Sequence, residues 1–272
     1  MSQLPWHDEL IAALDKLKAA ARYRHPRLRE GMQGIEIVLD GRRLLSFCSN
    51  DYLGLAGHAE IKKAFQQAVE QEGVGSGAAH LLTGHSVYHQ QLEDALAEFT
   101  GQPRALLFST GYMANMGVID GLLEKGDAVI QDKLNHASLL DGGRITAADQ
   151  LRYPHNDMAR LHKRLHTASH YRHKLIATDG VFSMDGDLAP LPEIMALAQQ
   201  HRAAVLVDDA HGFGVLGKHG RGSIEYWNIE PQQAPIVVGT FGKAFGTAGA
   251  FVVGNIDLSS VTDDYLSGDC QA

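Results

Sequence analysis

The chain has 272 residues, of which 44% are hydrophobic, so it is long enough to bury the core of one large or two modest domains. Its formal net charge of −8 comes from 24 basic and 32 acidic residues without a long run of either sign, which argues against nucleic acid as a partner. The N-terminal sequence has no basic segment followed by an apolar stretch, and no window approaches the ~20 apolar residues of a membrane span. With two cysteines, Cys48 and Cys270, that match no metal or redox motif, we expect a cytoplasmic protein without disulfides or membrane association.

Residues 1–48 are predicted to form an N-terminal helix and hairpin. Apolar residues at helical spacing predict the helix over about 8–23. Two β-rich runs, 35–39 and 44–48, flank Asp40-Gly41, a residue pair typical of a hairpin turn. Further helical patterns follow near 58–72, 85–99 and 112–124.

After Gly101, short apolar runs alternate with helical patterns. The seven candidate strands are 105–108, 128–130, 151–153, 175–177, 204–207, 236–238 and 250–253. Continuous apolar strands between amphipathic helices, such as 188–200, predict an α/β fold with a mostly parallel seven-stranded sheet between helices. Such sheets bind ligands at the carboxyl ends of their strands, so the residues after each run are the candidate site.

Three of these strands are followed by polar residues. Gly111 and Tyr112 open a helix after the first strand, where backbone N–H groups and the helix dipole favour a phosphate, although an ordinary capped helix is the alternative. His136 follows the second strand and could present its flat ring to a planar ligand, or be a structural histidine. Ser183 lies after the fourth strand, in a loop whose hydroxyls and acids also suit turns.

The fifth strand ends in Asp208 and Asp209, followed closely by His211. Adjacent strand residues point to opposite sides, so we expect one carboxylate to face a ligand and the other a loop or a helix N-terminus. A buried carboxylate that stays ionised needs a cationic partner, and a protonated pyridine nitrogen would serve.

A single lysine, Lys243, follows the sixth strand in GTFGKAFGTAGAF (239–251). An amine attacks carbonyls only when neutral, and apolar surroundings or a nearby cation lower its pKa from about 10.4. Lysine, strand-end aspartate, histidine and a phosphate-binding helix start are together what pyridoxal phosphate requires. For Lys243 alone, a surface lysine in a flexible glycine loop is the alternative.

Other motifs carry less weight. GFGVLG (212–217) matches G-x-G-x-x-G, but residues 208–211 separate it from the strand, which argues against a dinucleotide site. His85 and His89 have the spacing of helical zinc ligands without the glutamate of H-E-x-x-H, so we expect a solvated face and no metal site. A hydrolytic metal centre at 208–211 lacks further suitably spaced ligands.

The sequence resembles the fold-type I pyridoxal phosphate enzymes, and within them the α-oxoamine synthases. The resemblance runs from about residue 20 to 254 through SNDYLGLA (49–56), GSGAAHLLTGHSVYHQQLE (75–93), STGYMAN (109–115), LNHASLLDG (134–142), TDGVFSMDGDLAPL (178–191), VDDAHGFGVLGKHGRG (207–222) and GTFGKAFGTAGAF. It implies an aspartate-aminotransferase-like large domain over 49–254 that binds pyridoxal 5′-phosphate. It also implies a homodimer with the active site at its interface.

The branch that the sequence resembles most condenses L-alanine with pimeloyl-CoA or pimeloyl-acyl carrier protein in biotin biosynthesis. That reaction releases CO2 and the free thiol and yields 8-amino-7-oxononanoate. The resemblance makes Lys243 the covalent anchor of the cofactor and the general base, with Asp208 on the pyridine nitrogen. His136 would stack on the ring and His211 would bind its phenolic oxygen.

The remaining roles implied by the resemblance concern the phosphate and the substrates. The residues that would bind the cofactor and its phosphate are Gly111, Tyr112, Ser183 and Thr240. Those that would contact the substrates are Arg22, Asn50 and His136.

The family pattern stops near Asn255, whereas family members continue into a smaller C-terminal domain that supplies an arginine for the amino-acid carboxylate. We therefore expect 255–272 to be a polar tail unrelated to the family and the small domain to be missing, as after a frameshift or truncation. Two alternatives stay open. One is another α-oxoamine synthase, such as glycine C-acetyltransferase; the other is a truncated remnant that binds cofactor or a full-length partner without turnover.

Overall fold

The computed structural model describes residues 4–233 and 235–254. The chain divides into two compact units, the first ending at Cys48 and the second beginning at Ser49. The expected polar tail, 255–272, lies outside the described residues. Within the described ranges, no helix has both the length and the apolar character needed to cross a membrane.

The first unit contains one helix and a small antiparallel sheet. Its elements are α1 (His7–Ala19), β1 (Arg29–Glu30), β2 (Glu36–Leu39) and β3 (Arg42–Leu45). The predicted helix ends earlier than its apolar spacing suggested, because Ala21 has a φ of 53°, which a continuing helix does not allow. The predicted hairpin is present around Asp40 and Gly41, both with positive φ.

The second hairpin strand was predicted at 44–48 and instead spans Arg42–Leu45. A two-residue turn pairs the residues on either side of it, so Leu39 pairs with Arg42 and the strand begins at once. The apolar residues of the run were therefore a poorer guide to the strand's limits than the turn.

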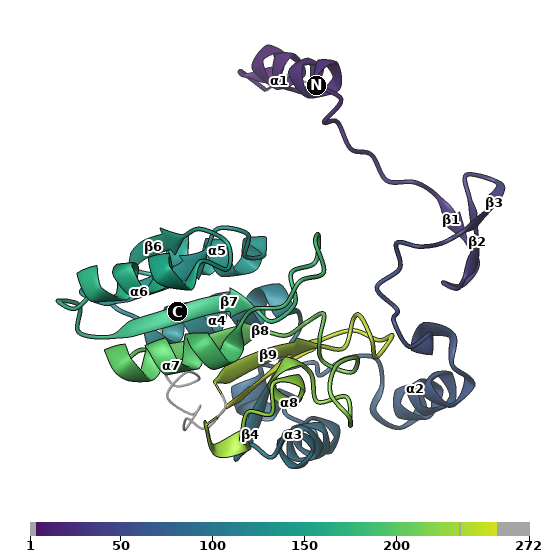
Figure 1. Ribbon diagram of the computed structural model, residues 1–272. Coiled ribbons are helices and arrows are strands. Elements are labelled where there is room, and N and C mark those ends of the chain that lie inside the picture. The colour runs from purple at the N-terminus through teal and green to yellow at the C-terminus, as the bar shows by residue number, and fades with distance from the viewer. Residues whose placement is uncertain (1–3, 234, 255–272) are drawn as a thin grey trace. The chain divides into compact units, whose positions relative to one another are not determined.

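The second unit is built on one seven-stranded sheet, shown with its helices in Figure 1. The strand order is β4-β10-β9-β8-β7-β5-β6; β10 is antiparallel to both neighbours and the other pairs are parallel. This confirms the predicted mostly parallel α/β fold and all seven of its strands. The strands are β4 (Arg104–Phe108), β5 (Ala128–Asp132), β6 (Asp149–Tyr153), β7 (Lys174–Asp179), β8 (Ala204–Asp208), β9 (Ile236–Thr240) and β10 (Ala250–Gly254).

Helices cover both faces of the sheet because consecutive strand residues are apolar and point to opposite sides. Val129 and Leu175 pack against α4 (Gly111–Leu122) and α5 (Ala137–Ile145). Their neighbours Ile130 and Ile176 pack on the other face against α6 (Met158–Thr167) and α7 (Leu191–His201). The other helices are η1 (Leu55–Gly57), α2 (Ala59–Glu72), η2 (His80–Gly84), α3 (Val87–Thr100), α8 (Ser223–Tyr226) and η3 (Pro231–Gln233).

The carboxyl ends of the parallel strands form one rim of the sheet. β5 and β7 are neighbours although β6 lies between them in the sequence, so the strand order reverses beside them. The register places Asp179, the last residue of β7, opposite Asp208, the last residue of β8. Ligands of open α/β sheets bind where the strand order reverses at this edge, and the predicted site residues follow these same strands.

Candidate active site

The adjacent carboxylates Asp208 and Asp209 turn to different partners, as strand alternation predicted. Asp209 accepts a hydrogen bond from the backbone N–H of Ser223 (2.8 Å) at the start of α8. Burial raises the pKa of Asp209 to about 7. Asp208 accepts from the Asn115 side-chain Nδ2 (2.5 Å) and from the Ala210 backbone N–H (3.0 Å). Asp209 therefore holds a helix start, and Asp208 is held in place at the rim.

Lys243 is connected to the beginning of the second unit through a chain of polar atoms. Its Nζ lies 3.0 Å from His211 Nε2, and His211 Nδ1 lies 2.6 Å from the Tyr52 hydroxyl. The Tyr52 hydroxyl donates to Asn50 Oδ1 at 3.3 Å. Burial raises the pKa of Tyr52, so the hydroxyl keeps its proton.

His211 is neutral in this arrangement, which fixes the direction of each hydrogen bond. Burial, and secondly the charge of Lys243, lower the pKa of His211 to about 4. A neutral imidazole has one donor and one acceptor. Because Tyr52 donates to Asn50, His211 Nδ1–H donates to the Tyr52 oxygen, which leaves Nε2 to accept from Lys243.

Burial also lowers the pKa of Lys243, opposed by the charges of Asp208 and Asp179. Burial, and secondly the charge of Asp208, raise the pKa of Asp179 to about 8. At neutral pH Asp179 therefore holds a proton. Burial thus moves the amine toward its neutral, nucleophilic form, and the neighbouring carboxyl groups oppose this shift.

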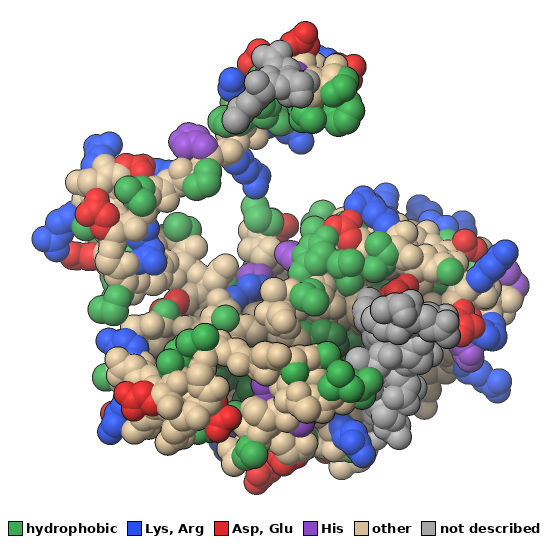
Figure 2. All heavy atoms as spheres, turned by 180° about the vertical axis from the view of Figure 1, so that it is seen from behind, with side chains coloured by type: hydrophobic (Ala, Val, Ile, Leu, Met, Phe, Trp, Pro, Cys, Tyr) green, Lys and Arg blue, Asp and Glu red, His purple; other side chains and the backbone are tan. Residues whose placement is uncertain are grey.

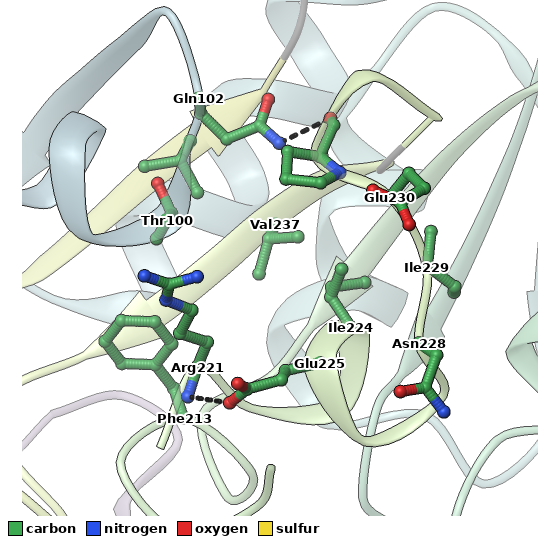
Figure 3. Close-up of a pocket in the computed structure, with 12 residues that line it drawn as sticks. Thr100, Gln102, Phe213, Arg221, Ile224, Glu225, Asn228, Ile229, Glu230 and Val237 are labelled. Carbon is green, nitrogen blue, oxygen red and sulfur yellow. Dashed lines mark hydrogen bonds between the residues drawn. The ribbon is translucent and has the colours of Figure 1, made fainter. Parts of the chain in front are cut away.

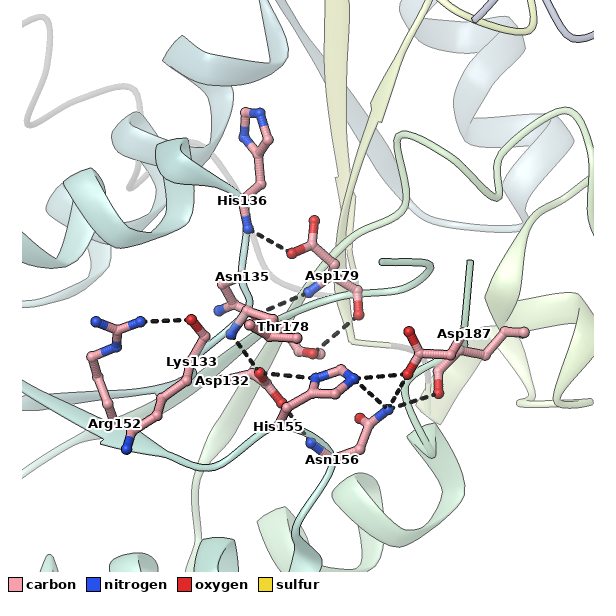
Figure 4. Close-up of polar contacts among 12 residues, drawn as sticks. Asp132, Lys133, Asn135, His136, Arg152, His155, Asn156, Thr178, Asp179 and Asp187 are labelled. Carbon is pink, nitrogen blue, oxygen red and sulfur yellow. Dashed lines mark hydrogen bonds and ion pairs between the residues drawn. The ribbon is translucent and has the colours of Figure 1, made fainter. Parts of the chain in front are cut away.

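His136 is tied to Asp208 through two buried side chains. Asn115 Nδ2 donates to Ser138 Oγ (2.9 Å) as well as to Asp208, and Ser138 Oγ lies 2.7 Å from His136 Nδ1. The backbone N–H of His136 donates to Asp179 at 2.7 Å. In Figure 4 the ring of His136 points away from Asp179, and the residue is exposed. Its ring is therefore available to a planar ligand at the rim.

The helix start predicted to bind phosphate has an ordinary cap as well as free donors. Thr110 accepts from the Met113 backbone N–H at 3.1 Å, and Gly111 is the first residue of α4. Tyr112 donates its hydroxyl to Asp141 of α5, and this hydrogen bond raises the pKa of Tyr112. The N–H groups of a first helical turn lack intrahelical partners, so the capped helix retains donors for an anion.

Two hydroxyl residues predicted at the phosphate lie after other strands. Thr240 ends β9, where its hydroxyl donates to the Gly249 carbonyl (3.0 Å) and accepts from the Gly242 N–H (3.2 Å). Ser183 is exposed on the loop after β7. Thr240 therefore shapes the turn that carries Lys243.

The loop that carries Ser183 is anchored by a histidine between two carboxylates, drawn in Figure 4. His155 Nδ1 lies 3.1 Å from Asp132 at the end of β5, and its Nε2 lies 2.8 Å from Asp187 on the loop. Asn156 adds a bond from Nδ2 to Asp187 at 2.8 Å. Burial lowers the pKa of His155, but the bonds to Asp187 and Asp132 outweigh it and raise that pKa overall. The loop is thereby fixed to two strand ends.

The predicted residues thus fall into three groups. The first group consists of residues that the structure connects. Lys243, His211 and Asn50 lie in one chain of polar contacts, and His136 is linked to Asp208 in another. The second group, on neighbouring rim loops and helix starts, is Gly111, Tyr112, Ser183 and Thr240. The third group is Arg22 alone, which belongs to the first unit and is exposed there.

Four residues of these chains had no predicted role: Tyr52, Asn115, Ser138 and Asp179. Asp179 could have been found by the reasoning that found Asp208, since both end a buried strand. The other three lie within recognised motifs, but nothing in the local pattern indicates their distant partners.

A cavity of about 170 Å³ lies elsewhere and is drawn in Figure 3. It is lined by Val237, near the start of β9, and Val253, near the end of the antiparallel β10, so it faces the opposite edge of the sheet. Gln102 Nε2 donates to the Pro231 carbonyl at 2.8 Å along its wall. Its lining includes none of the predicted site residues.

The donor set at the rim fits pyridoxal phosphate. Lys243 is an amine with a lowered pKa, Asp208 is a buried carboxylate able to face a protonated ring nitrogen, and His136 offers an open ring face. A helix start at Gly111 supplies backbone donors for the phosphate.

Comparison with known proteins identifies the family. The model of the family described as aminotransferase class I and II matches residues 42–264. The chain belongs to the aminotransferase class I and II family. This aminotransferase-family chain is 59% identical to the 8-amino-7-oxononanoate synthase of Nitrosococcus oceani, over 85% of the chain and 61% of that protein. It is 54% identical to that of Methylococcus capsulatus, over 94% of the chain and 65% of that protein.

Solved structures show the same fold. Serine palmitoyltransferase from Sphingomonas wittichii superposes with a TM-score of 0.87 at 37% identity, over 97% of the chain and 66% of that protein. The Francisella tularensis 8-amino-7-oxononanoate synthase superposes with a TM-score of 0.69 at 33% identity, over 81% of the chain and 61% of that protein. This member of the aminotransferase family thus spans 61–65% of the length of its curated relatives.

Proposed function

We propose that this chain binds pyridoxal 5′-phosphate and belongs to an acyltransferase that condenses L-alanine with a pimeloyl thioester to 8-amino-7-oxononanoate, a step of biotin biosynthesis. The observation that carries the proposal is the lysine, histidine and aspartate arrangement at the rim, in a chain 53–59% identical to proteins named 8-amino-7-oxononanoate synthase. The thioester is carried by coenzyme A or acyl carrier protein.

Lys243 is the proposed covalent anchor and general base. Bound pyridoxal phosphate supplies an electron sink that stabilises negative charge on the amino-acid α-carbon. Burial lowers the pKa of Lys243, which increases the fraction of amine able to take the α-proton at Nζ. His211 Nε2, 3.0 Å from Nζ, accepts a hydrogen bond from the amine and orients it.

The other rim residues bind and orient the cofactor. Asp208, fixed by Asn115, would hold the ring nitrogen of the cofactor and favour its protonated form. His136 would hold the ring face, and His211 would hold the phenolic oxygen of the cofactor. The proposed phosphate-binding residues are Gly111, Tyr112, Ser183 and Thr240, and the proposed substrate contacts are Arg22, Asn50 and His136.

One rival reaction has a specific observation in its favour. Two structures named serine palmitoyltransferase superpose at TM-scores of 0.85 and 0.87, above the 0.69 of the Francisella synthase. Serine palmitoyltransferase and glycine C-acetyltransferase would differ from the proposed enzyme in their amino acid and acyl donor, while the cofactor chemistry would be the same. The identities of 53–59% to 8-amino-7-oxononanoate synthases favour alanine and a pimeloyl donor.

We further propose that the chain forms a homodimer and acts in the cytoplasm, where acyl thioesters are supplied. Hydrophobic side chains are exposed among charged ones on the face drawn in Figure 2. On α2, Phe65 is 68% exposed beside Val69 and lines a cavity with both Val69 and Gly246. Exposed apolar groups of this kind support a second copy as partner. Light scattering during size-exclusion chromatography gives the mass, and a monomer at micromolar concentration would contradict the dimer.

The test of the reaction is thiol release by the purified 272-residue chain with added cofactor. L-Alanine with pimeloyl-CoA is compared with glycine plus acetyl-CoA and L-serine plus palmitoyl-CoA. A blank without amino acid corrects for the exposed thiol of Cys48. We expect alanine-dependent release that is lost in Lys243→Ala. Preference for another pair would establish the rival reaction, and no release with any pair would contradict the proposed activity of this chain.

A further inference from the structure

Two histidines and a glutamate converge outside the rim site. One nitrogen from each of His80 and His85 and one carboxylate oxygen of Glu93 all lie within 4.8 Å of one another. Imidazole and carboxylate together are a ligand set that suits zinc and similar divalent transition metals. We propose that His80, His85 and Glu93 bind one divalent transition-metal ion of the zinc class, with water completing its coordination.

The protein orients His85 as a metal ligand would be oriented. His85 Nε2 lies 3.1 Å from Gln90 Oε1, and Gln90 Nε2 donates to Asp94 at 2.9 Å. The bond to Asp94 fixes which end of the amide faces His85, so His85 Nε2 carries the proton. His85 Nδ1 then presents its lone pair to the cluster. A second residue that fixes the tautomer of a ligating histidine is typical of metal sites.

His80 faces that lone pair directly. Its Nε2 lies 2.8 Å from His85 Nδ1, and the two ring centroids are 4.4 Å apart. A tetrahedral zinc with Zn–N bonds of about 2.0–2.1 Å separates two nitrogens by about 3.3 Å. The pair therefore has to open by roughly half an ångström to admit the ion. His80 is exposed and begins η2, a single π-helical turn, so it can make this small shift.

Glu93 supplies the negative charge. One of its oxygens accepts from the Leu107 backbone N–H at 3.2 Å, so the carboxylate is anchored while its second oxygen remains for a further partner. The start of α3 lies nearby, and its dipole disfavours a cation. A carboxylate in the coordination shell offsets that effect, which two histidines alone would not.

His89 has a different role from the one its spacing suggested. Its Nδ1 accepts from the Ser86 backbone N–H (3.2 Å) and lies 2.8 Å from Ser86 Oγ, forming the cap of α3. That nitrogen is therefore committed to the helix start. The sequence predicted a solvated His85–His89 face, whereas the structure pairs His85 with His80.

The cluster has an entry path. A cavity of about 570 Å³ is lined by His80 and His89 and extends to Ser109 at the end of β4 and to Phe241 after β9. An ion bound there would join η2 to α3 and stiffen one wall of that cavity. Neither Lys243 nor Asp208 lines that cavity, and the proposal does not depend on the proposed reaction.

The test is zinc binding by the tag-free, chelator-treated 272-residue chain, measured by competition with a chromophoric chelator. We expect one equivalent of tightly bound Zn²⁺ in the wild type and its loss in His85→Gln. Gln90→Ala touches no metal and is expected to weaken binding about 10–100-fold. His162→Gln is the matched control, because His162 also lies beside another histidine. The ring centroids of His162 and His201 are 5.1 Å apart.

Co²⁺ gives a second readout, since the four-coordinate ion absorbs strongly in the visible range. We expect that absorption in the wild type and in His162→Gln and its loss in Glu93→Gln, with circular dichroism confirming that each variant is folded. The proposal is overturned if the wild type binds no ion more tightly than His85→Gln. It is equally overturned if Gln90→Ala binds zinc as the wild type does, or if His162→Gln loses as much affinity as His85→Gln.

Discussion

Replacing Lys243 with Met removes the cation whose Nζ lies 3.0 Å from His211 Nε2 and leaves an apolar side chain of similar length. The pKa of His211 is lowered to about 4, first by burial and second by Lys243, while Asp208 acts in the opposite direction. A like charge at such a distance shifts a pKa by about 1–3 units. Burial persists in the variant, so we expect the pKa of His211 to rise by roughly 1–2 units and to stay below 6.5.

The assay is a pH titration of the cofactor-free protein, following the imidazole signals by two-dimensional ¹H–¹⁵N NMR. His211→Gln identifies the signal by its disappearance. Lys163→Met, which removes an exposed lysine on α6, is the matched control and is expected to leave the pKa of His211 unchanged. An unchanged or lower pKa in Lys243→Met would refute the electrostatic coupling of the two residues. So would an equal rise in Lys163→Met.

Three further predictions concern stability. Because its bonds to Asp187 and Asp132 raise the pKa of His155, the stability it adds is complete below pH ~6.5 and is lost as pH rises through its folded-state pKa. Urea unfolding should therefore show a larger loss for His155→Gln at pH 6 than at pH 9, and an equal loss at both would contradict the ion pairs. Leu206 is fully buried in β8, so Leu206→Ala should lower the free energy of unfolding by about 2–5 kcal/mol, whereas a loss under 1 kcal/mol would argue against this core. Thr110→Ala removes the cap of α4 and should lower the free energy of unfolding by about 1 kcal/mol in the same assay. An unchanged free energy of unfolding would contradict the cap.

The fold could be predicted because it depends on local patterns. Continuous apolar runs mark strands buried on both faces, and the polar residues that follow them mark one rim. Lys243 and Asp208 were chosen as candidates in this way, since each stands at or just after the end of such a run.

Contacts between distant segments could not be predicted by the same reasoning. The bond between Tyr52 and His211 joins residues 159 positions apart, and that between Asn115 and Asp208 joins residues 93 apart. Neither pair has a spacing that indicates contact; each meets only because of the strand order and helix packing. The lowered pKa values of Lys243 and His211 likewise depend on burial, which composition does not give.

The pairing of His85 with His80 was missed for a related reason. Helical spacing joins His85 with His89, but α3 begins after His85, so the two histidines do not share one regular helix. The π-helical turn that brings His80 to His85 has no simple sequence pattern.

The central claim is that Lys243 bonds covalently to pyridoxal phosphate, and borohydride reduction followed by peptide mass spectrometry tests it most directly. We expect reduction of the chain incubated with cofactor to attach one pyridoxyl group, located on the peptide that contains Lys243, and to abolish the visible absorption. Lys243→Ala should gain no such group. An adduct spread over other lysines, or an equal adduct in Lys243→Ala, would contradict the account.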